Sequence, residues 1–306
     1  MSQGPEIQRT LCRMCDYRCG IDVHLEDGRI VDILGNKDHL WNRGRLCAKA
    51  RAAVDMVYHP DRILAPLKRT DEGWQEIPLA QALDEIAARL AAIRDHHGAR
   101  SIGVWKGEAI GFGQQETIAR RFAHALGSPN YLSNDSMCYV GRYMGYKLVD
   151  GAWPVPDLEN ARCIVLWGAN PPYAHPNMTQ YITAARRKGA TLVVVDPRLS
   201  AISRRADIHA PLRPGTDGAL AWGLIHQIVE MGAYDKDFVE RYTVGFAKVA
   251  EYARAFTPEA VEVETGLPAA TVRAIARAMT DAAPQMAAYV GNGLEHHENS
   301  VNNIRS

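Results

Sequence analysis

The sequence predicts an α/β protein that begins with a small β-hairpin domain and continues into domains built on parallel strands. Three observations support this fold class. Four of the six cysteines frame a hairpin pattern near the N-terminus, a helical period follows from residue 79, and two continuous apolar runs, Cys163–Trp167 and Thr191–Val195, flank a helical segment. Continuous apolar runs are typical of parallel strands that are buried on both faces of a sheet.

The bulk composition fits a globular protein that acts on small molecules. The chain has 306 residues, 47% of them hydrophobic, with 35 basic and 35 acidic side chains. This length allows a sizeable core and makes two domains the default. A balanced charge argues against nucleic acid or an anionic membrane surface as the main partner. We therefore expect a small-molecule substrate.

Two features of the sequence bear on localisation. No apolar run reaches membrane-spanning length, so we expect no direct membrane insertion. The start of the chain, Met1–Glu6, shows neither an apolar signal core nor twin arginines. The sequence therefore predicts a cytoplasmic protein, in a reducing compartment that keeps thiols available as ligands.

The N-terminal cysteines form the ligand pattern C-x2-C-x3-C-x27-C, made by Cys12, Cys15, Cys19 and Cys47. Three thiolates within eight residues can converge on one centre from a single loop, while the fourth returns from a distance. Iron–sulfur clusters are held by four such thiolates, whereas structural zinc sites usually use two separated pairs of ligands. We predict a [4Fe-4S] cluster, with zinc, and then disulfides or free thiols, as the alternatives.

A hairpin pattern separates the third and fourth cysteines. Ile21–Leu25 alternates, residues 26–28 supply a turn, and Arg29–Ile33 resumes the alternation. The hairpin explains how Cys47 can be remote in sequence but near in space. Residues 1–60 are therefore predicted to form a small cluster domain.

Residues 61–135 are predicted to form a partial α/β domain. Apolar residues repeat at helical spacing from Leu79 and the helix is expected to end at Gly98. A strand is expected at 101–105, and a second helix at 114–126, with apolar Ile118 and Phe122 opposite two arginines.

Residues 136–306 are predicted to form a Rossmann-like domain. The runs at 163–167 and 191–195, with a helix at 178–188 between them, indicate a βαβ crossover, whose ligands lie beyond the carboxyl ends of the strands. Those ends carry Gly168, Asn170 and Pro171 on the first strand, and Asp196, Pro197 and Arg198 on the second. Glycine would let a phosphate approach the backbone, and the acidic residue would take a ribose hydroxyl. Ordinary turn chemistry is the competing interpretation.

The remaining pattern continues this domain. Gly215 and Asp217 precede and open a helix, a setting that favours anions, although Asp217 could equally be a first-turn acid that stabilises the helix. Helices are expected at about 216–231, 246–255 and 268–280, and a strand at 286–290. Residues 301–306 have the pattern of a helix that has just begun, which predicts that the domain is truncated.

Several single residues leave alternatives open. Cys138 lies among polar neighbours and could be a nucleophile, a metal ligand or a buried filler, whereas Cys163 lies inside an apolar strand and is expected to be filler. Lys49 is either a surface lysine or a cation beside the cluster. In the group 295–298 the adjacent His296 and His297 would point to different faces, which argues against a metal site.

Together these segments resemble the molybdopterin oxidoreductases of the dimethyl-sulfoxide-reductase superfamily. The segments that carry the resemblance are Cys12-x2-Cys15-x3-Cys19-x27-Cys47-Ala48-Lys49, the Cys138 segment, Gly168–Pro171, Asp196–Arg198 and Arg213–Asp217. The resemblance covers essentially the whole chain, yet the catalytic subunits of the family are far longer. It therefore implies an N-terminal portion of such a subunit.

The resemblance also implies cofactors and roles. It implies a [4Fe-4S] cluster on the four N-terminal cysteines, and Mo or W between two molybdopterin guanine dinucleotides. Lys49 would relay electrons, Cys138 would ligate the metal, and the strand ends with Gly215 would bind one dinucleotide, with Asp196 at the ribose and Asp217 near the guanine. An electron-transfer protein or subunit would be the partner.

Two residues bear on the substrate. Formate dehydrogenases of the family generally place His after the metal-ligating residue, whereas Tyr139 follows Cys138 here. Asp16 follows Cys15, and in the related tungsten-dependent acetylene hydratase an Asp in this place is the catalytic acid; a local cap of the thiolate loop is the simpler role. The leading interpretation is an oxidoreductase. A non-redox hydratase that uses Asp16 and an iron–sulfur electron-transfer module without catalysis are the alternatives.

Overall fold

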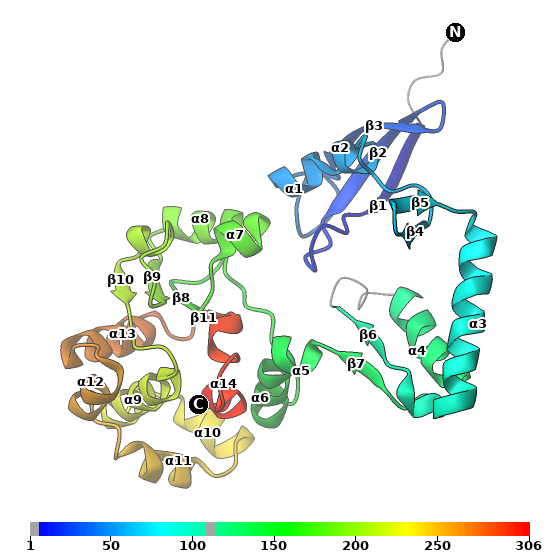
Figure 1. Cartoon of the computed structure of the whole chain (residues 1–306). Helices are drawn as coiled ribbons and strands as arrows, with labels where there is room; N and C mark the ends of the chain where they lie inside the picture. The colour runs from blue at the N-terminus through cyan, green and yellow to red at the C-terminus, as the bar shows by residue number, and fades with distance from the viewer. Residues whose placement is uncertain (1–5, 108–113) are drawn as a thin grey trace. The chain divides into compact units, whose positions relative to one another are not determined.

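The structure is a computed structural model that describes residues 6–107 and 114–306. The chain divides into two compact units, Met1–Asp135 and Ser136–Ser306. Figure 1 shows the order of their elements along the chain. The first five residues, on which the expected lack of an export signal partly rests, lie outside the described residues.

The first unit opens with a three-stranded antiparallel sheet. Its strands are β1 (Glu6–Leu11), β2 (Gly20–Glu26) and β3 (Arg29–Gly35), in the order β1-β2-β3. The turn between β2 and β3 places Asp27 and Gly28 at φ 48° and 75°, the left-handed region that a tight hairpin requires. The predicted hairpin is therefore confirmed, and β1 adds a strand that the sequence did not predict. Two short helices follow, α1 (Ala48–Arg51) and α2 (Ala53–Val57).

The rest of the first unit is α/β. Its elements are the hairpin β4 (Leu67–Thr70) and β5 (Gly73–Glu76), then α3 (Leu79–His97), the 3-10 turn η1 (Ala99–Ser101), β6 (Val104–Lys106), α4 (Gln114–Leu126) and β7 (Tyr131–Ser133). Strands β6 and β7 are parallel. Both predicted helices are confirmed, while the strand begins three residues late because η1 occupies its expected start. Ile118 and Phe122 of α4 are 66% and 46% exposed, so the predicted apolar face is not buried.

The second unit contains a four-stranded parallel sheet. Its strands are β8 (Cys163–Trp167), β9 (Thr191–Val195), β10 (Ile208–Ala210) and β11 (Met286–Val290), in the order β10-β9-β8-β11. The chain therefore runs outward from β8 to β10 and then returns to the other side of β8. This reversal creates a topological switch point between β8 and β11, where open parallel sheets bind ligands. Only the three-residue β10 was not predicted.

Helices surround this sheet (Figure 1). They are α5 (Asp135–Cys138), α6 (Val140–Asp150), α7 (Pro171–Ala174), η3 (Pro176–Met178), α8 (Thr179–Arg187), η4 (Ser203–Arg205), α9 (Asp217–Glu230), α10 (Lys236–Tyr242), α11 (Phe246–Ala253), α12 (Pro258–Thr265), α13 (Ala269–Ala282), η5 (Asn292–Leu294) and α14 (Ser300–Arg305). The unit boundary falls within α5, after Asp135. The predicted helices on α9, α11 and α13 are confirmed; α10 and α12 were not predicted.

The core of the second unit forms between the sheet and its helices. Val165 and Val193 of the sheet pack with Leu220 of α9 and Ile275 of α13, each at most 1% exposed. Cys163 belongs to the same cluster, and burial raises the pKa of its thiol to about 11. A thiol in that state is a poor nucleophile, so the prediction of a filler is confirmed. Among the described residues, no helix is both long and apolar enough to cross a membrane.

Candidate cofactor sites

The cysteine loop connects β1 to β2. Cys12 and Cys19 are buried, and the Cys12 amide donates to the Cys19 carbonyl over 2.8 Å, which closes the loop at its base. Cys15 is half-buried within the loop, and Cys47 is half-buried at the N-cap of α1. The sheet therefore presents three thiols from one closed loop.

Asn42 connects this loop to the segment that leads to Cys47. Its side-chain oxygen accepts from the Gly20 amide over 2.8 Å, and its Nδ2 donates to the carbonyls of Gly20 and Arg45, each over 3.0 Å. Asn42 is 0% exposed, so these bonds are shielded from water. One buried side chain thus ties the residue after Cys19 to a residue two positions before Cys47. The sequence analysis missed Asn42, because a single asparagine in a loop carries no periodic signal.

The Cys12 thiol lies close enough to Cys15, Cys47 and Lys49 for their charges to act on it. The pKa of Cys12 is raised, mainly by burial and further by Cys15 and Cys47, while a backbone hydrogen bond at Met14 and the Lys49 ammonium act in the opposite direction. Several thiolates cannot accumulate so close together without a compensating cation, and a bound metal group reverses this balance. The donor set therefore fits a cationic iron–sulfur cluster. Lys49 is half-buried in α1, and Asp16 lies on the exposed part of the loop.

A site for one metal ion, unlike a cluster site, would need several ligands that meet at a single point. The described residues contain no group of three His, Cys, Asp or Glu side chains that could hold one metal ion. A [4Fe-4S] cluster is held by four thiolates spread around several irons, so its ligands need not meet at one point. At 295–298 the Glu295 side chain is only 1% exposed and pairs with Arg142 over 3.2 Å.

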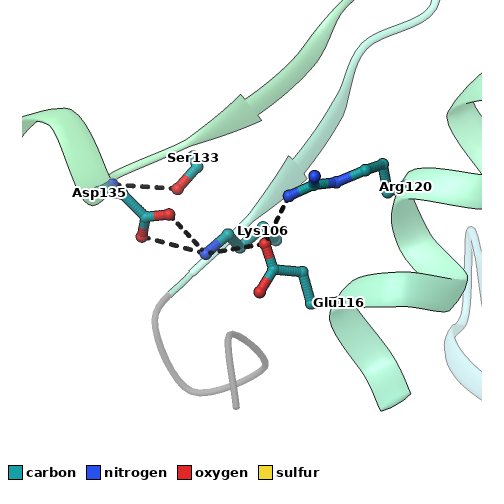
Figure 2. Close-up of polar contacts among 5 residues, drawn as sticks. All are labelled: Lys106, Glu116, Arg120, Ser133 and Asp135. Carbon is teal, nitrogen blue, oxygen red and sulfur yellow. Dashed lines mark hydrogen bonds and ion pairs between the residues drawn. The ribbon is translucent and has the colours of Figure 1, made fainter. Parts of the chain in front are cut away.

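A buried ion pair holds the start of α5 (Figure 2). Lys106 ends β6 and its side chain is 2% exposed; its Nζ donates to the two carboxylate oxygens of Asp135 over 3.0 and 2.9 Å. Glu116 of α4 lies 3.9 Å from the same ammonium and is paired with Arg120 over 2.9 Å. The Asp135 amide donates to Ser133 Oγ over 3.0 Å, so the residue that opens α5 is fixed through both backbone and side chain.

We expect Lys106→Met to lower the free energy of unfolding by roughly 3 kcal/mol, because the Asp135 side chain is only 21% exposed and would lose its ion pair with Lys106. Urea unfolding followed by circular dichroism measures this. The matched control is Lys68→Met, which breaks an ion pair with Glu85 whose side chains are 46% and 42% exposed, and should be indistinguishable from wild type. Equal losses in the two variants would contradict a special role for the buried pair.

Cys138 ends α5 and is half-buried. Its carbonyl accepts a hydrogen bond from the Asn292 side chain over 3.3 Å. Asn292 opens η5, which follows β11. The segment after the strand at the switch point therefore contacts Cys138. The sequence predicted Cys138 as a candidate ligand but missed its neighbour.

The switch point between β8 and β11 is shaped by glycines. Gly168 follows β8 with φ 57°, and a Cβ there would lie 2.7 Å from a Leu294 methyl group. A Cβ on Gly291, just after β11, would lie 2.3 Å from the Gly168 carbonyl oxygen. Both backbones therefore approach as closely as only glycine permits. The two loops therefore pack directly against each other at the switch point, the edge where open parallel sheets bind ligands.

Asn170 adds an unsatisfied polar group at the same edge. It caps α7, Pro171 is the first helical residue, and Asn170 Oδ1 is buried with no hydrogen-bond partner among the described residues. A buried amide group of this kind costs free energy unless something bonds to it. A polar ligand at the end of β8 would supply that bond.

The end of β9 shows turn chemistry as well as a candidate site. Asp196 Oδ1 accepts from the Arg198 amide over 2.8 Å, which is the local turn that the sequence offered as the simpler interpretation. Pro197 and Arg198 are exposed, while Asp196 is half-buried. This single bond occupies one of several acceptor positions on the carboxylate, so the rest remain available to a hydroxyl donor.

Asp217 lies beside this end of the sheet. Gly215 adopts φ 88° before α9, and Asp217 is the first residue of the helix. It is 5% exposed and accepts from Trp167 Nε1 over 2.7 Å. Burial raises the pKa of the Asp217 carboxyl, the Trp167 bond lowers it, and more weakly His297 lowers and Asp196 raises it. Asp196, just after β9, therefore acts electrostatically on Asp217, the first residue of α9.

We expect Asp217→Asn to raise stability at neutral pH. A folded pKa above the unfolded value means that the native carboxyl binds its proton more tightly, so its contribution to stability falls as pH rises from 3.8 through the raised value. Asparagine removes this loss and can still accept from Trp167. Thermal unfolding across pH should show that the difference in melting temperature between the variant and wild type grows in favour of the variant as pH rises. A variant less stable than wild type at neutral pH would contradict this expectation.

The fold and these sites define a class of protein: an iron–sulfur domain joined to a Rossmann-like domain with a cysteine near its switch point. Residues 6–59 match the molybdopterin oxidoreductase Fe4S4 domain, and residues 62–306 match the molybdopterin oxidoreductase family. The chain belongs to the molybdopterin oxidoreductases. These two domains imply a [4Fe-4S] cluster and a molybdopterin cofactor with Mo or W.

Individual relatives span several activities. The chain is 34% identical to the thiosulfate reductase molybdopterin-containing subunit PhsA of Salmonella typhimurium, over 90% of this chain and 36% of the relative. It is 33% identical to acetylene hydratase of Syntrophotalea acetylenica, over 87% and 37%. The solved acetylene hydratase from Pelobacter acetylenicus superposes with a TM-score of 0.82 at 30% identity, over 97% of this chain and 42% of that one. The chain thus spans less than half the length of these relatives.

Proposed function

We propose that this chain is the N-terminal part of the catalytic subunit of a molybdenum- or tungsten-dependent oxidoreductase that uses two molybdopterin guanine dinucleotides. The observation that carries the proposal is the grouping of the Cys12, Cys15 and Cys47 thiols near Lys49 in one unit, together with a glycine-lined switch point and the Asn292–Cys138 contact in the other. Relatives named as reductases and dehydrogenases support redox chemistry.

The first unit would hold the cluster. Cys12, Cys15, Cys19 and Cys47 are the proposed ligands, because they carry the only compact cysteine pattern in the sequence. The buried Asn42 would keep the loop and the returning segment in register. Lys49 supplies a positive charge beside the thiolates, which stabilises added negative charge on the cluster and so favours its role in electron relay.

The second unit would hold one guanine dinucleotide. Gly168, just after β8, would present its backbone to a phosphate, Asn170 offers a buried amide oxygen without a partner, and Asp196 has acceptor positions for a ribose hydroxyl. Asp217 would face the guanine, whose N1–H and exocyclic amino group are donors that a carboxylate can accept. The accompanying contacts would come from Pro171, Pro197, Arg198 and Gly215, which lie in the same three loops.

Cys138 would bind the metal through its thiolate, a ligand type suited to soft metal centres. When bound, the metal–pterin group supplies two-electron exchange with the substrate, and the cluster carries single electrons. The chain's own residues would anchor the thiolate through the Asn292 contact and place the Lys49 cation beside the cluster. Several relatives are named as subunits, which supports an electron-transfer partner for this chain as well.

The proposal is tested by metal analysis and by acceptor dependence. Purified full-length protein should contain iron, Mo or W, and guanine dinucleotide, and its turnover should require an artificial electron acceptor or donor. Iron without Mo, W or pterin would favour an iron–sulfur electron-transfer module without catalysis.

A hydratase of the acetylene hydratase type is the second candidate. Two observations favour it: the solved acetylene hydratase shares the fold at a TM-score of 0.82, and Asp16 lies directly after a proposed cluster ligand. Asp16 would then act as the acid that protonates or orients the substrate. Turnover that proceeds undiminished without any electron acceptor would select this candidate.

A further inference from the structure

The side chain of Asn292 contacts the proposed metal ligand directly. Its Nδ2 donates to the Cys138 carbonyl over 3.3 Å and lies 3.9 Å from Cys138 Sγ, within the range of a hydrogen bond to sulfur. We propose that Asn292 is a positioning residue that aims the Cys138 thiolate at the metal and withdraws electron density from its sulfur. This inference rests on the proposed function of Cys138 as a metal ligand.

Arg142 fixes which end of the Asn292 amide faces Cys138. The Arg142 guanidinium donates from Nη2 to Asn292 Oδ1 over 3.1 Å. A guanidinium has donors and no acceptor, so the amide must turn its oxygen toward Arg142. The amide nitrogen then faces Cys138 with two N–H groups. The hydrogen-bond partners thereby decide an orientation that the shape of the amide alone leaves ambiguous.

Arg142 is itself held rigidly. Its Nη1 donates to the Val290 carbonyl over 2.6 Å, and its guanidinium pairs with Glu295 over 3.2 Å. The guanidinium also lies over the Trp153 ring, 4.7 Å from its centre. The Arg142 side chain is 10% exposed and that of Glu295 is 1% exposed, so water competes little for these bonds. The support behind Asn292 is therefore formed before any metal binds.

The backbone strengthens this support. The Arg142 amide donates to Glu295 Oε2 over 2.9 Å, which joins the start of α6 to the segment after η5. A Cβ on Gly141 would lie 2.7 Å from Ser300 Oγ, so α6 can approach that segment closely only with glycine at this position. Cys138 lies four residues before Arg142. The thiol and its hydrogen-bond donor are thus attached to two segments that are locked together.

A hydrogen bond to a ligating sulfur changes the metal as well as the geometry. Hydrogen bonds to thiolate sulfur and the burial around it set the reduction potentials of metal–sulfur centres. An N–H donor lowers the electron donation of the sulfur, which makes the metal easier to reduce. Asn292 should therefore hold the midpoint potential of the metal above the value that Cys138 alone would give.

The experiment compares Asn292→Ala and Asn292→Asp in the full-length holoenzyme. Alanine removes the donor without adding charge, and aspartate keeps the size of the side chain but cannot donate. We expect the midpoint potential of the metal, titrated by electron paramagnetic resonance, to shift to lower values in both, and kcat to fall about 10–100-fold, as for other outer partners of metal ligands, with little change in KM. Asn302→Asp, at an exposed position of α14, is the matched control and should leave the potential unchanged.

Arg142→Met provides a second variant, which acts on Cys138 only through Asn292. It frees the Asn292 amide without touching Cys138, so it should shift the potential in the same direction. Loss of metal from Asn292→Ala with the cluster absorption intact would also support the inference, because the hydrogen bond would then be needed for ligation itself. An Asn292→Ala enzyme with full metal content and the potential of wild type overturns it.

Different results would contradict Cys138 as the metal ligand and Asn292 as its positioning residue. If Cys138→Ser keeps the metal content and potential of wild type, Cys138 is not the ligand, and both the assignment and the role of Asn292 fall. If Cys138→Ser loses metal or changes its potential while Asn292→Ala has no effect, only the inference about Asn292 fails.

Discussion

Cys138→Ser should abolish metal-dependent turnover while leaving the iron–sulfur absorption of the full-length protein unchanged. A serine hydroxyl is a far weaker ligand for a soft metal than a thiolate. Removing an outer partner of a metal ligand costs about 10–100-fold in activity or affinity, and removal of the ligand itself should exceed that loss. Cys138 is not one of the four proposed cluster ligands, so the ligand set of the cluster stays complete in the variant.

Three measurements check this result: activity, the Mo or W content and the visible absorption of the cluster. Cys163→Ser is the matched control for thiol chemistry, because Cys163 is 0% exposed in the sheet and contacts no proposed cofactor. It should keep its activity at moderate temperature and lose only stability. Loss of the cluster absorption in Cys138→Ser would show that Cys138 belongs to the cluster instead.

Asp16→Asn should separate the two candidate functions by the size of its effect. If the enzyme is a hydratase in which Asp16 is the acid, turnover should fall about 10²–10⁴-fold, the usual contribution of a positioned general acid or base. If the enzyme is an oxidoreductase in which Asp16 only caps the thiolate loop, the rate should change modestly. Asparagine keeps the side-chain size and one acceptor oxygen, so the loop should be preserved.

The control for Asp16→Asn is Asp38→Asn, an exposed carboxylate in the same unit that pairs with Arg9 over 3.2 Å. It tests whether loss of one negative charge near this surface matters by itself, and it should leave turnover unchanged. Activity with and without an electron acceptor gives the readout for both variants. An unchanged rate in Asp16→Asn eliminates Asp16 as an acid in either chemistry.

Local patterns were enough to predict the elements that carry the sites. The hairpin after Cys19 was predicted from alternation and a turn, and β8 and β9 from continuous apolar runs, because each of these signals depends only on neighbouring residues. The same reasoning placed the ends of β8 and β9 at the ligand edge of a parallel sheet. Short elements such as β10 escaped because three residues are too few to show a period.

The contacts that support the proposed ligands could not be predicted in this way. Lys106 and Asp135 are 29 residues apart, and Asn292 lies 154 residues beyond Cys138. Each pair meets only after strands and helices have packed, and nothing in the local sequence distinguishes Lys106, Asp135 or Asn292 from an ordinary surface residue. For α3 and α4 the sequence pattern predicted burial that the structure does not show. Residues such as Leu83 and Phe122 repeat at the spacing of a buried helix face but are exposed.

The sequence by itself determined the cysteine pattern, the hairpin, the parallel strands and the family, because ligand spacing and hydrophobic periodicity are written along the chain. Tertiary structure alone decided the order of the strands, the switch point between β8 and β11, and the partners of Asp135, Asp217 and Cys138. The physical reason is that a hydrogen bond or ion pair gains its strength from burial and alignment, and both exist only once distant segments of the chain have packed together.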